Sequence, residues 1–317
     1  MGMTDTVTKE YMRGNKVFAD AFNYLIYGGE QVVKPALLQE LDTTEIAIPF
    51  ALDEEENTTE EAVQKYRDVL KSTVIMQDAK ASYILLGVEN QTDVHYAMPV
   101  RNIIYDALQY GKQVSEVAKK HKNQSDGKRH NRGEYLSGFY KEDRIRPVIT
   151  LVIHFGANKW DGPLSLYEMM DLEDEKLLEF VQDYRIFLID PYKLTDNDLE
   201  KFSSSLGDVL GYIKYSKDKN ALLKFLNDSQ VMIMDNDAAR VIRDITNTPI
   251  YVPDGKGEID MCKAVKDLMD ESKTEGIAEG IKKMALKMYK NGDSIEKIAE
   301  TAEVSINQVK EWINSTV

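Results

Sequence analysis

The sequence predicts an α/β fold followed by a mostly helical C-terminal extension, and three observations lead to this prediction. Short runs rich in β-branched and aromatic residues alternate with segments of helical periodicity up to about residue 191. From Thr195 onwards, apolar residues recur at three- and four-residue steps, as expected for helices. The chain of 317 residues is 43% hydrophobic and 30% charged. This composition is typical of globular proteins, so disordered and fibrous classes are excluded.

The first elements are a helix and a hairpin. Residues 14–29 predict a helix, because their apolar positions follow helical spacing up to a pair of glycines. Residues 53–60 are acidic and turn-rich, which indicates a solvated loop. Residues 68–76 and 82–89 are β-rich runs separated by a short polar segment. That spacing predicts an antiparallel hairpin.

A second helix and two strands complete the predicted α/β region. Residues 98–114 predict a helix with Pro99 in its first turn. Residues 119–146 are polar, basic and weakly periodic, so we expect a mobile surface excursion there. Buried strands are predicted at 147–156 and 184–191, with a short helix between them. The expected order is helix, two strands, helix, strand, helix, strand.

These elements divide the chain into three predicted parts. They are an α/β domain at 1–194, a helical extension at 195–257, and a long helix with a helix-turn-helix-like tail at 258–317. In the tail, SIEKIAETA and INQVKEWI are the two expected helices. The second carries only Lys310 as a base, opposed by Glu311. Because phosphate attraction is then weak, DNA reading and simple packing or dimer contact both remain open.

Charge and cysteine content limit the function classes. The net charge is −14, whereas nucleic-acid-binding proteins are usually basic. Residues 111–146 reverse this locally, with ten Lys/Arg against five Asp/Glu. The single cysteine, Cys262, excludes an internal disulfide and a thiolate zinc site. With no apolar run long enough to cross a bilayer, we expect a cytoplasmic protein without a membrane partner.

Acidic and amide side chains gather at the predicted hairpin. Glu89 and Gln91 leave one face together, because side chains at i and i+2 of a strand point the same way. Asp68, at the start of the neighbouring strand, can meet them. A metal-dependent nuclease needs such carboxylates to hold Mg²⁺ against a phosphate. Periodicity alone leaves this open, since acidic residues at strand ends are usually solvated, and Asp78 in the hairpin loop is a rival to Asp68.

The segments RDVLK, YILLGVENQT and YAMPVRNIIYDALQY resemble the core signature of the Rpn family, the recombination-promoting nucleases or putative transposases of the PD-(D/E)XK superfamily. The resemblance covers residues 14–190 in element order and is carried by 67–113. It implies a restriction-endonuclease-like mixed sheet flanked by helices. The activity it implies is metal-dependent DNA endonuclease, linked to recombination or mobile elements.

The same resemblance implies a catalytic set of Asp68, Glu89 and Gln91, with Asp68 and Glu89 as ligands of Mg²⁺ or Mn²⁺. Gln91 stands where the commoner Glu-x-Lys pattern has lysine. A glutamine cannot carry a charge or take up a proton, so it can only orient water or phosphate, and the metal must activate the nucleophile. The alternative is a catalytically weak or inactive nuclease-fold module that binds DNA or protein. RNA processing by the same chemistry is a third class.

Four further residues are expected to support the site. Asp20 on the first helix is a candidate extra carboxylate, with a solvated surface aspartate as the alternative. Arg101 is expected to contact a phosphate, or else to form a structural ion pair, and Tyr105 to pack behind it. Gln113 completes a pair with Tyr110 that resembles the family pattern.

The basic excursion supplies the expected route for DNA. Six cations in it are candidates for contacts with the DNA backbone, namely Lys119, Lys120, Lys122, Lys128, Arg129 and Arg132. A loop that only confers solubility is the alternative. A homodimer and an inhibitor protein are further candidate partners.

Overall fold

The computed structural model describes most of the chain, namely residues 3–42, 44–47, 63–66, 68–77, 80–123, 131–171, 175–228 and 232–315. The predicted loop at 53–60 lies outside the described residues. No helix among those described is both long enough and apolar enough to span a membrane.

The centre of the molecule is a mixed five-stranded sheet with the strand order β1-β4-β5-β6-β7. Its strands are β1 (Gln39–Glu40), β4 (Val69–Gln77), β5 (Lys80–Gln91), β6 (Val148–His154) and β7 (Phe187–Ile189). β1, β4 and β5 are antiparallel neighbours, whereas β5, β6 and β7 are parallel. Two small sheets pair β2 (Thr44–Ala47) with β3 (Val63–Tyr66), and β8 (Ile233–Asp235) with β9 (Glu258–Asp260).

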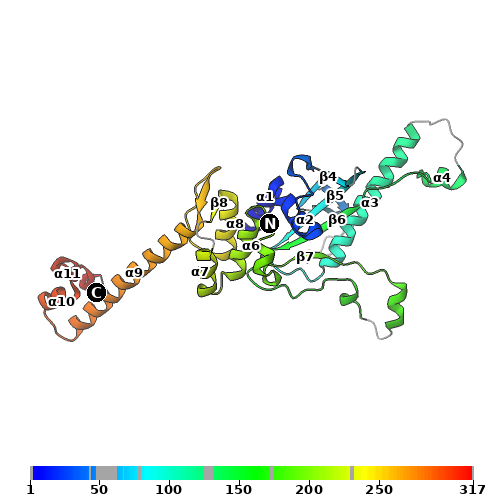
Figure 1. The fold of residues 1–317 in the computed structure, drawn as a ribbon. Helices are drawn as coiled ribbons and strands as arrows, with labels where there is room; N and C mark the ends of the chain where they lie inside the picture. Colours follow the sequence, from blue (N-terminus) through cyan, green and yellow to red (C-terminus); the bar gives the residue numbers. More distant parts are fainter. Residues whose placement is uncertain are drawn as a thin grey trace.

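Helices surround this sheet and extend from it (Figure 1). They are α1 (Met3–Arg13), α2 (Asn15–Tyr27), α3 (Met98–Asn123), α4 (Arg132–Ser137), α5 (Asp196–Leu199), α6 (Leu206–Tyr215), α7 (Lys219–Asp228), α8 (Asn236–Thr246), α9 (Met261–Lys290), α10 (Ile295–Ala302) and α11 (Ile306–Asn314). Among the residues that the structure describes, four short 3-10 helices lie between the longer elements: η1 (Pro35–Leu37), η2 (Tyr167–Met169), η3 (Glu175–Phe180) and η4 (Pro191–Lys193).

The predicted hairpin is confirmed as the β4–β5 pair, which runs in register from Val69 opposite Val88 to Gln77 opposite Lys80. Alternation along the strands directs side chains to two different cores. Val88 and Ile153 join the large core with α2 and α6, while Val152 packs with Met98 of α3. The two faces of the sheet are therefore covered by different helices, and α3 covers the second face.

The helical region after residue 195 packs onto the same core as the sheet. Leu210 of α6 and Ile242 of α8 are fully buried in the cluster that also contains Leu151 of β6. α8 also contacts α1, the first described helix. Residues far apart in sequence thus build one body around the sheet.

The excursion predicted at 119–146 contains helical structure in its described parts, where the sequence predicted none. α3 continues to Asn123, because lysine is a good helix former and cations favour a helix C-terminus. α4 begins with a capping box between Asn131 and Glu134 and ends at Gly138, whose φ of 66° is left-handed. Together they form an arm that projects from the body (Figure 1).

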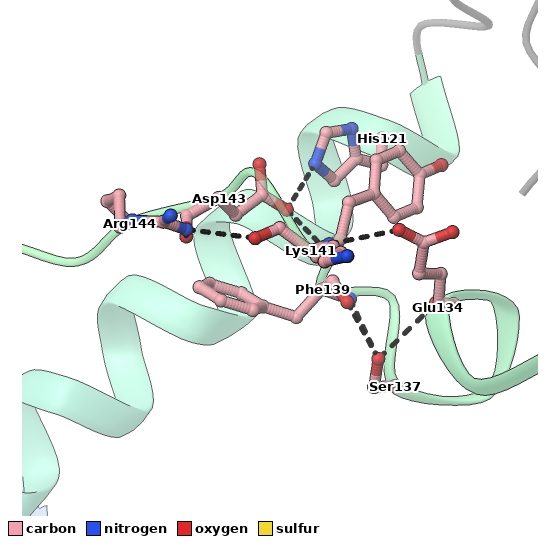
Figure 2. Close-up of polar contacts among 8 residues, drawn as sticks. His121, Glu134, Ser137, Phe139, Lys141, Asp143 and Arg144 are labelled. Carbon is pink, nitrogen blue, oxygen red and sulfur yellow. Dashed lines mark hydrogen bonds and ion pairs between the residues drawn. The ribbon is translucent and has the colours of Figure 1, made fainter.

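Polar contacts hold the return segment of this arm against α3 (Figure 2). His121 Nε2 lies 2.8 Å from Asp143 Oδ2, which also accepts a 2.6 Å hydrogen bond from the backbone N–H of Tyr140. The ring of Tyr140 stacks on His121 with 3.7 Å between centroids. These contacts fix the backbone of the arm where it turns back toward β6.

α9 leads away from the body to the C-terminal helices α10 and α11 (Figure 1). Residues 270–280 of α9 are exposed on every side. Beyond them, Ala285, Ile298 and Val309 bring α9, α10 and α11 together in a separate small core. The two helices expected from the sequence of the tail are confirmed as α10 and α11.

Candidate functional site

The end of the β4–β5 hairpin brings two carboxylates to one face of the sheet. Val69 is paired with Val88, and continuing this register by one residue sets Asp68 opposite Glu89. Opposite residues of an antiparallel pair leave the same face, about 4.5–5.5 Å apart at Cβ. Continued in this way, the strand register places both carboxylates on one face of the sheet.

Asp68 is held by the backbone of the neighbouring strand. Its Oδ2 accepts a 2.8 Å hydrogen bond from the backbone N–H of Asn90, and its Oδ1 lies 4.0 Å from Nζ of Lys9. Burial raises the pKa of Asp68, and Asp5 adds to this, while Asn90, Lys9 and Arg101 lower it; the net effect is upward. A further cation beside Asp68 would favour its charged form.

Glu89 is fully buried and forms an ion pair with α3. The NH2 nitrogen of Arg101 lies 3.0 Å from Oε2 of Glu89. The guanidinium carbon of Arg101 is also 5.7 Å from the centroid of the Tyr105 ring. Tyr105, only 2% exposed, thus packs behind Arg101, in the relative positions expected for these two residues.

A cavity of about 290 Å³ lies at this end of the sheet. Its charged and polar lining includes Asp5, Asp68, Gln91, Asp93, His95 and Arg101. Glu89 does not line the cavity itself but contacts Arg101, which does. The cavity lining therefore combines three carboxylates, of Asp5, Asp68 and Asp93, with a guanidinium and the amide of Gln91, and a fourth carboxylate, of Glu89, pairs with that guanidinium. Such groups can bind a divalent cation or a phosphate ester.

Asp5 is a site residue that the sequence reasoning missed. It lies on α1, where its Oδ1 accepts a 3.2 Å hydrogen bond from the Thr92 hydroxyl. Lys9, one turn later, reaches Asp68 from the same helix. The four-residue spacing of Val7 and Tyr11 could have indicated this helix. No local signal could have indicated that α1 faces β5.

Two expected supporting residues lie elsewhere, which corrects the sequence-based expectation. Asp20 is 1% exposed, and its carboxylate accepts hydrogen bonds of 2.6–3.0 Å from the backbone N–H and hydroxyl groups of Ser203 and Ser204. It fixes the segment before α6. Gln113 bonds through both amide atoms to the backbone of Arg146, at 2.7 and 3.1 Å. It ties the chain before β6 to α3.

The predicted DNA-binding cations are only partly within the described residues. Lys119, Lys120 and Lys122 are exposed on the last turns of α3, and Arg132 is exposed at the start of α4. Lys128 and Arg129 lie outside the described residues, as does Asp78, the rival to Asp68. Of the described four, Lys120 also lines a second cavity beside α3.

The carboxylates near the cavity are the donor groups that could hold a divalent cation. Among the described residues, no group of three or more His, Cys, Asp or Glu side chains is arranged to hold a metal ion. Mg²⁺, however, is usually held by one or two carboxylates together with substrate phosphates, rather than by a complete protein cage. Asp68 and Glu89 provide two such carboxylates, and Asp5 lines the same cavity as Asp68. The donor set fits Mg²⁺ or Mn²⁺ if the Glu89–Arg101 ion pair opens.

The chain matches a known protein family. The family model described as "Putative transposase, YhgA-like" matches residues 49–240, which is more than half of the chain. The match contains Asp68, Glu89, Gln91 and Arg101, whereas Asp5 on α1 and the tail from α9 onwards lie outside it. Comparison with curated proteins and with solved structures found no match.

Proposed function

The chain belongs to this YhgA-like family of putative transposases, and on that basis we propose that it is a metal-dependent endonuclease that hydrolyses phosphodiester bonds in DNA. The sheet with its flanking helices is then a restriction-endonuclease-like fold of the PD-(D/E)XK type. The biological setting that follows is recombination or the movement of genetic elements in the cytoplasm. A homodimer or an inhibitor protein would be natural partners of a nuclease that must be restrained.

One observation carries the proposal. Asp68 lies opposite Glu89 at the end of the hairpin, and Arg101 pairs with Glu89 while lining the same cavity as Asp68. The carboxylate of Asp68 and the guanidinium of Arg101 at one cavity, with the Glu89 carboxylate paired to that guanidinium, suit phosphodiester cleavage, in which an anionic phosphate must be bound and stabilised.

Each residue has a chemical role in this proposal. When bound, Mg²⁺ or Mn²⁺ would polarise the scissile phosphate and lower the pKa of a water molecule. Asp68 and Glu89 would hold the ion through carboxylate oxygens. Gln91 would orient water or phosphate through its amide, since it cannot accept a proton. Arg101, released from Glu89, would donate hydrogen bonds to a phosphate oxygen.

The second candidate is a nuclease-fold module that binds DNA or protein without efficient catalysis. Two specific features favour it. Glu89 is neutralised by Arg101 at 3.0 Å, and position 91 is a glutamine instead of the lysine of the commoner pattern. Both features would weaken a metal site that depends on Glu89.

A cleavage assay separates the two candidates. Purified protein would be incubated with supercoiled plasmid in Mg²⁺, Mn²⁺ or EDTA, beside Asp68→Asn and Glu89→Gln variants. Nicking that needs metal and disappears in both variants supports the endonuclease. Plasmid that stays intact in every metal while duplex DNA is retarded in a gel supports the binding module. A parallel RNA substrate decides whether the same chemistry acts on RNA.

A further inference from the structure

A second cavity, of about 400 Å³, lies along the C-terminal half of α3. Its floor includes Leu70 of β4 and Leu85 of β5, and its walls come from α3 and from the segment that precedes β6. We call this cavity the α3 groove. It is separate from the cavity at Asp68.

The α3 groove is cationic in a strongly acidic protein. Lys112, Lys120, Arg144 and Arg146 line it, against Asp42 and Glu116. The chain as a whole has a net charge of −14. Within the described parts of the chain, neither Lys112 nor Lys120 has a carboxylate within ion-pair distance. These two ammonium groups are therefore available to an external anion.

The arginine wall of the groove is held in place by backbone contacts. Arg146 is fixed by the two hydrogen bonds between its backbone and the Gln113 amide. The NH1 nitrogen of Arg144 donates to the carbonyl oxygens of Lys141 and Asp143, at 2.9 and 2.7 Å (Figure 2). Because these contacts fix the backbone of the segment before any ligand binds, little ordering of the backbone would be needed on binding.

The groove opens on the same face of the sheet as the candidate site. Leu85 and Glu89 leave one face of β5, because they are an even number of residues apart. Asp68 and Leu70, two residues apart at the start of β4, share a face for the same reason. Along α3, Arg101 and Lys112 are separated by roughly 16 Å, at 1.5 Å per residue.

We propose that the α3 groove binds backbone phosphates of the DNA strand that is cut at the Asp68–Glu89 site. At about 3.4 Å of duplex axis per nucleotide, the separation of roughly 16 Å corresponds to about five nucleotides from the scissile bond. This inference rests on the proposed function for its substrate. On this proposal, the DNA backbone contacts the cations of the α3 groove, whereas the sequence led us to expect contacts with the exposed cations of the arm.

The experiment measures duplex binding by fluorescence anisotropy in EDTA over a series of salt concentrations. Each phosphate contact contributes about 0.9 to the slope of log affinity against log salt. The double variant Lys112→Gln/Arg146→Gln should therefore reduce the magnitude of that slope by about 2. The charge-preserving variant Lys112→Arg/Arg146→Lys should keep it. The charge-matched control Lys219→Gln/Lys256→Gln, at exposed lysines of α7 and the segment before β9, should also keep it.

Two outcomes would contradict the proposal that the α3 groove binds backbone phosphates. One is a wild-type slope in Lys112→Gln/Arg146→Gln, together with a reduced slope in the arm variant Lys119→Gln/Lys122→Gln/Arg132→Gln. The other is a slope that falls equally in the charge-matched control. Since binding is measured without metal, absence of cleavage by the wild type would refute the endonuclease and leave the groove result intact.

Discussion

The guanidinium of Arg101 lies 3.0 Å from the carboxylate of Glu89, joining α3 to β5 across one face of the sheet. Glu89 is fully buried, while 29% of the Arg101 side chain is exposed at the cavity. The ion pair thus connects the stability of the sheet to the chemistry of the candidate site. A ligand that attracts Glu89 must compete with this guanidinium.

Removal of Arg101 should destabilise the protein. In Arg101→Ala, the buried Glu89 carboxylate loses its ion-pair partner, and breaking a pair of this kind costs about 3 kcal/mol. The double variant Glu89→Gln/Arg101→Ala removes the buried charge too, so it should lose less free energy of unfolding than Arg101→Ala alone. Urea unfolding of both variants measures this difference. Equal losses would mean that the ion pair contributes little.

Asp68→Ala should reduce plasmid cleavage by about 100-fold or more, because a preorganised charged group at the reacting phosphate is removed. Asp78→Ala, the variant of the rival carboxylate considered from the sequence, should cleave like the wild type. Initial rates in Mg²⁺ at equal protein concentration make the comparison. The opposite ranking would assign the catalytic carboxylate to Asp78.

Asp5→Asn should raise the Mg²⁺ concentration needed for half-maximal cleavage. Asp5 lines the cavity with Asp68 and raises the pKa of Asp68. Its carboxylate therefore adds negative potential where a cation would bind, and the neutral amide removes it. A metal titration of the cleavage rate measures the shift. An unchanged half-maximal Mg²⁺ concentration would mean that Asp5 does not contribute to metal binding and serves only as the acceptor of the Thr92 hydrogen bond.

Asp20→Ala should destabilise the protein without changing its metal requirement. The carboxylate is the common acceptor for four donor groups of Ser203 and Ser204. Their loss of an acceptor should cost about 2–4 kcal/mol of unfolding free energy. Thermal or urea unfolding gives the cost, and the metal titration used for Asp5→Asn serves as the comparison. A higher Mg²⁺ requirement in Asp20→Ala would instead indicate that Asp20 contributes to metal binding.

Cys262 should react slowly with a disulfide reagent near neutral pH. Burial raises the pKa of its thiol, and its Sγ donates a 3.3 Å hydrogen bond to the carbonyl oxygen of Leu226. The thiolate is the reactive form, so the rate in the folded protein should rise with pH beyond the unfolded pKa of about 8.5. The raised pKa also affects stability. Because the folded state binds the thiol proton more tightly than the unfolded state, the free energy of unfolding should fall as pH rises through that range. Rates from pH 7 to 10, with urea-unfolded protein as control, test this.

The sequence by itself determined the α/β class and the hairpin, and it led to the prediction that Asp68 and Glu89 share one face of the sheet. These features depend on short-range rules, because strand alternation fixes which side chains share a face and a short loop fixes the register. The family match over 49–240 contains all three of the catalytic residues expected from the sequence. The sequence predicted this helix only as far as residue 114, whereas α3 continues to Asn123. A polar and basic composition does not separate a loop from an exposed helix.

Only the tertiary structure decided which distant segments meet these residues. It brought Asp5 to Thr92 across 87 positions and Asp20 to Ser203 across 183. It also paired Arg101 with Glu89 and enclosed the groove between α3 and the segment before β6. Such contacts follow from the way whole helices pack on the sheet, and that packing is the sum of many apolar contacts. Local periodicity marks the buried face of each helix but does not specify its partner.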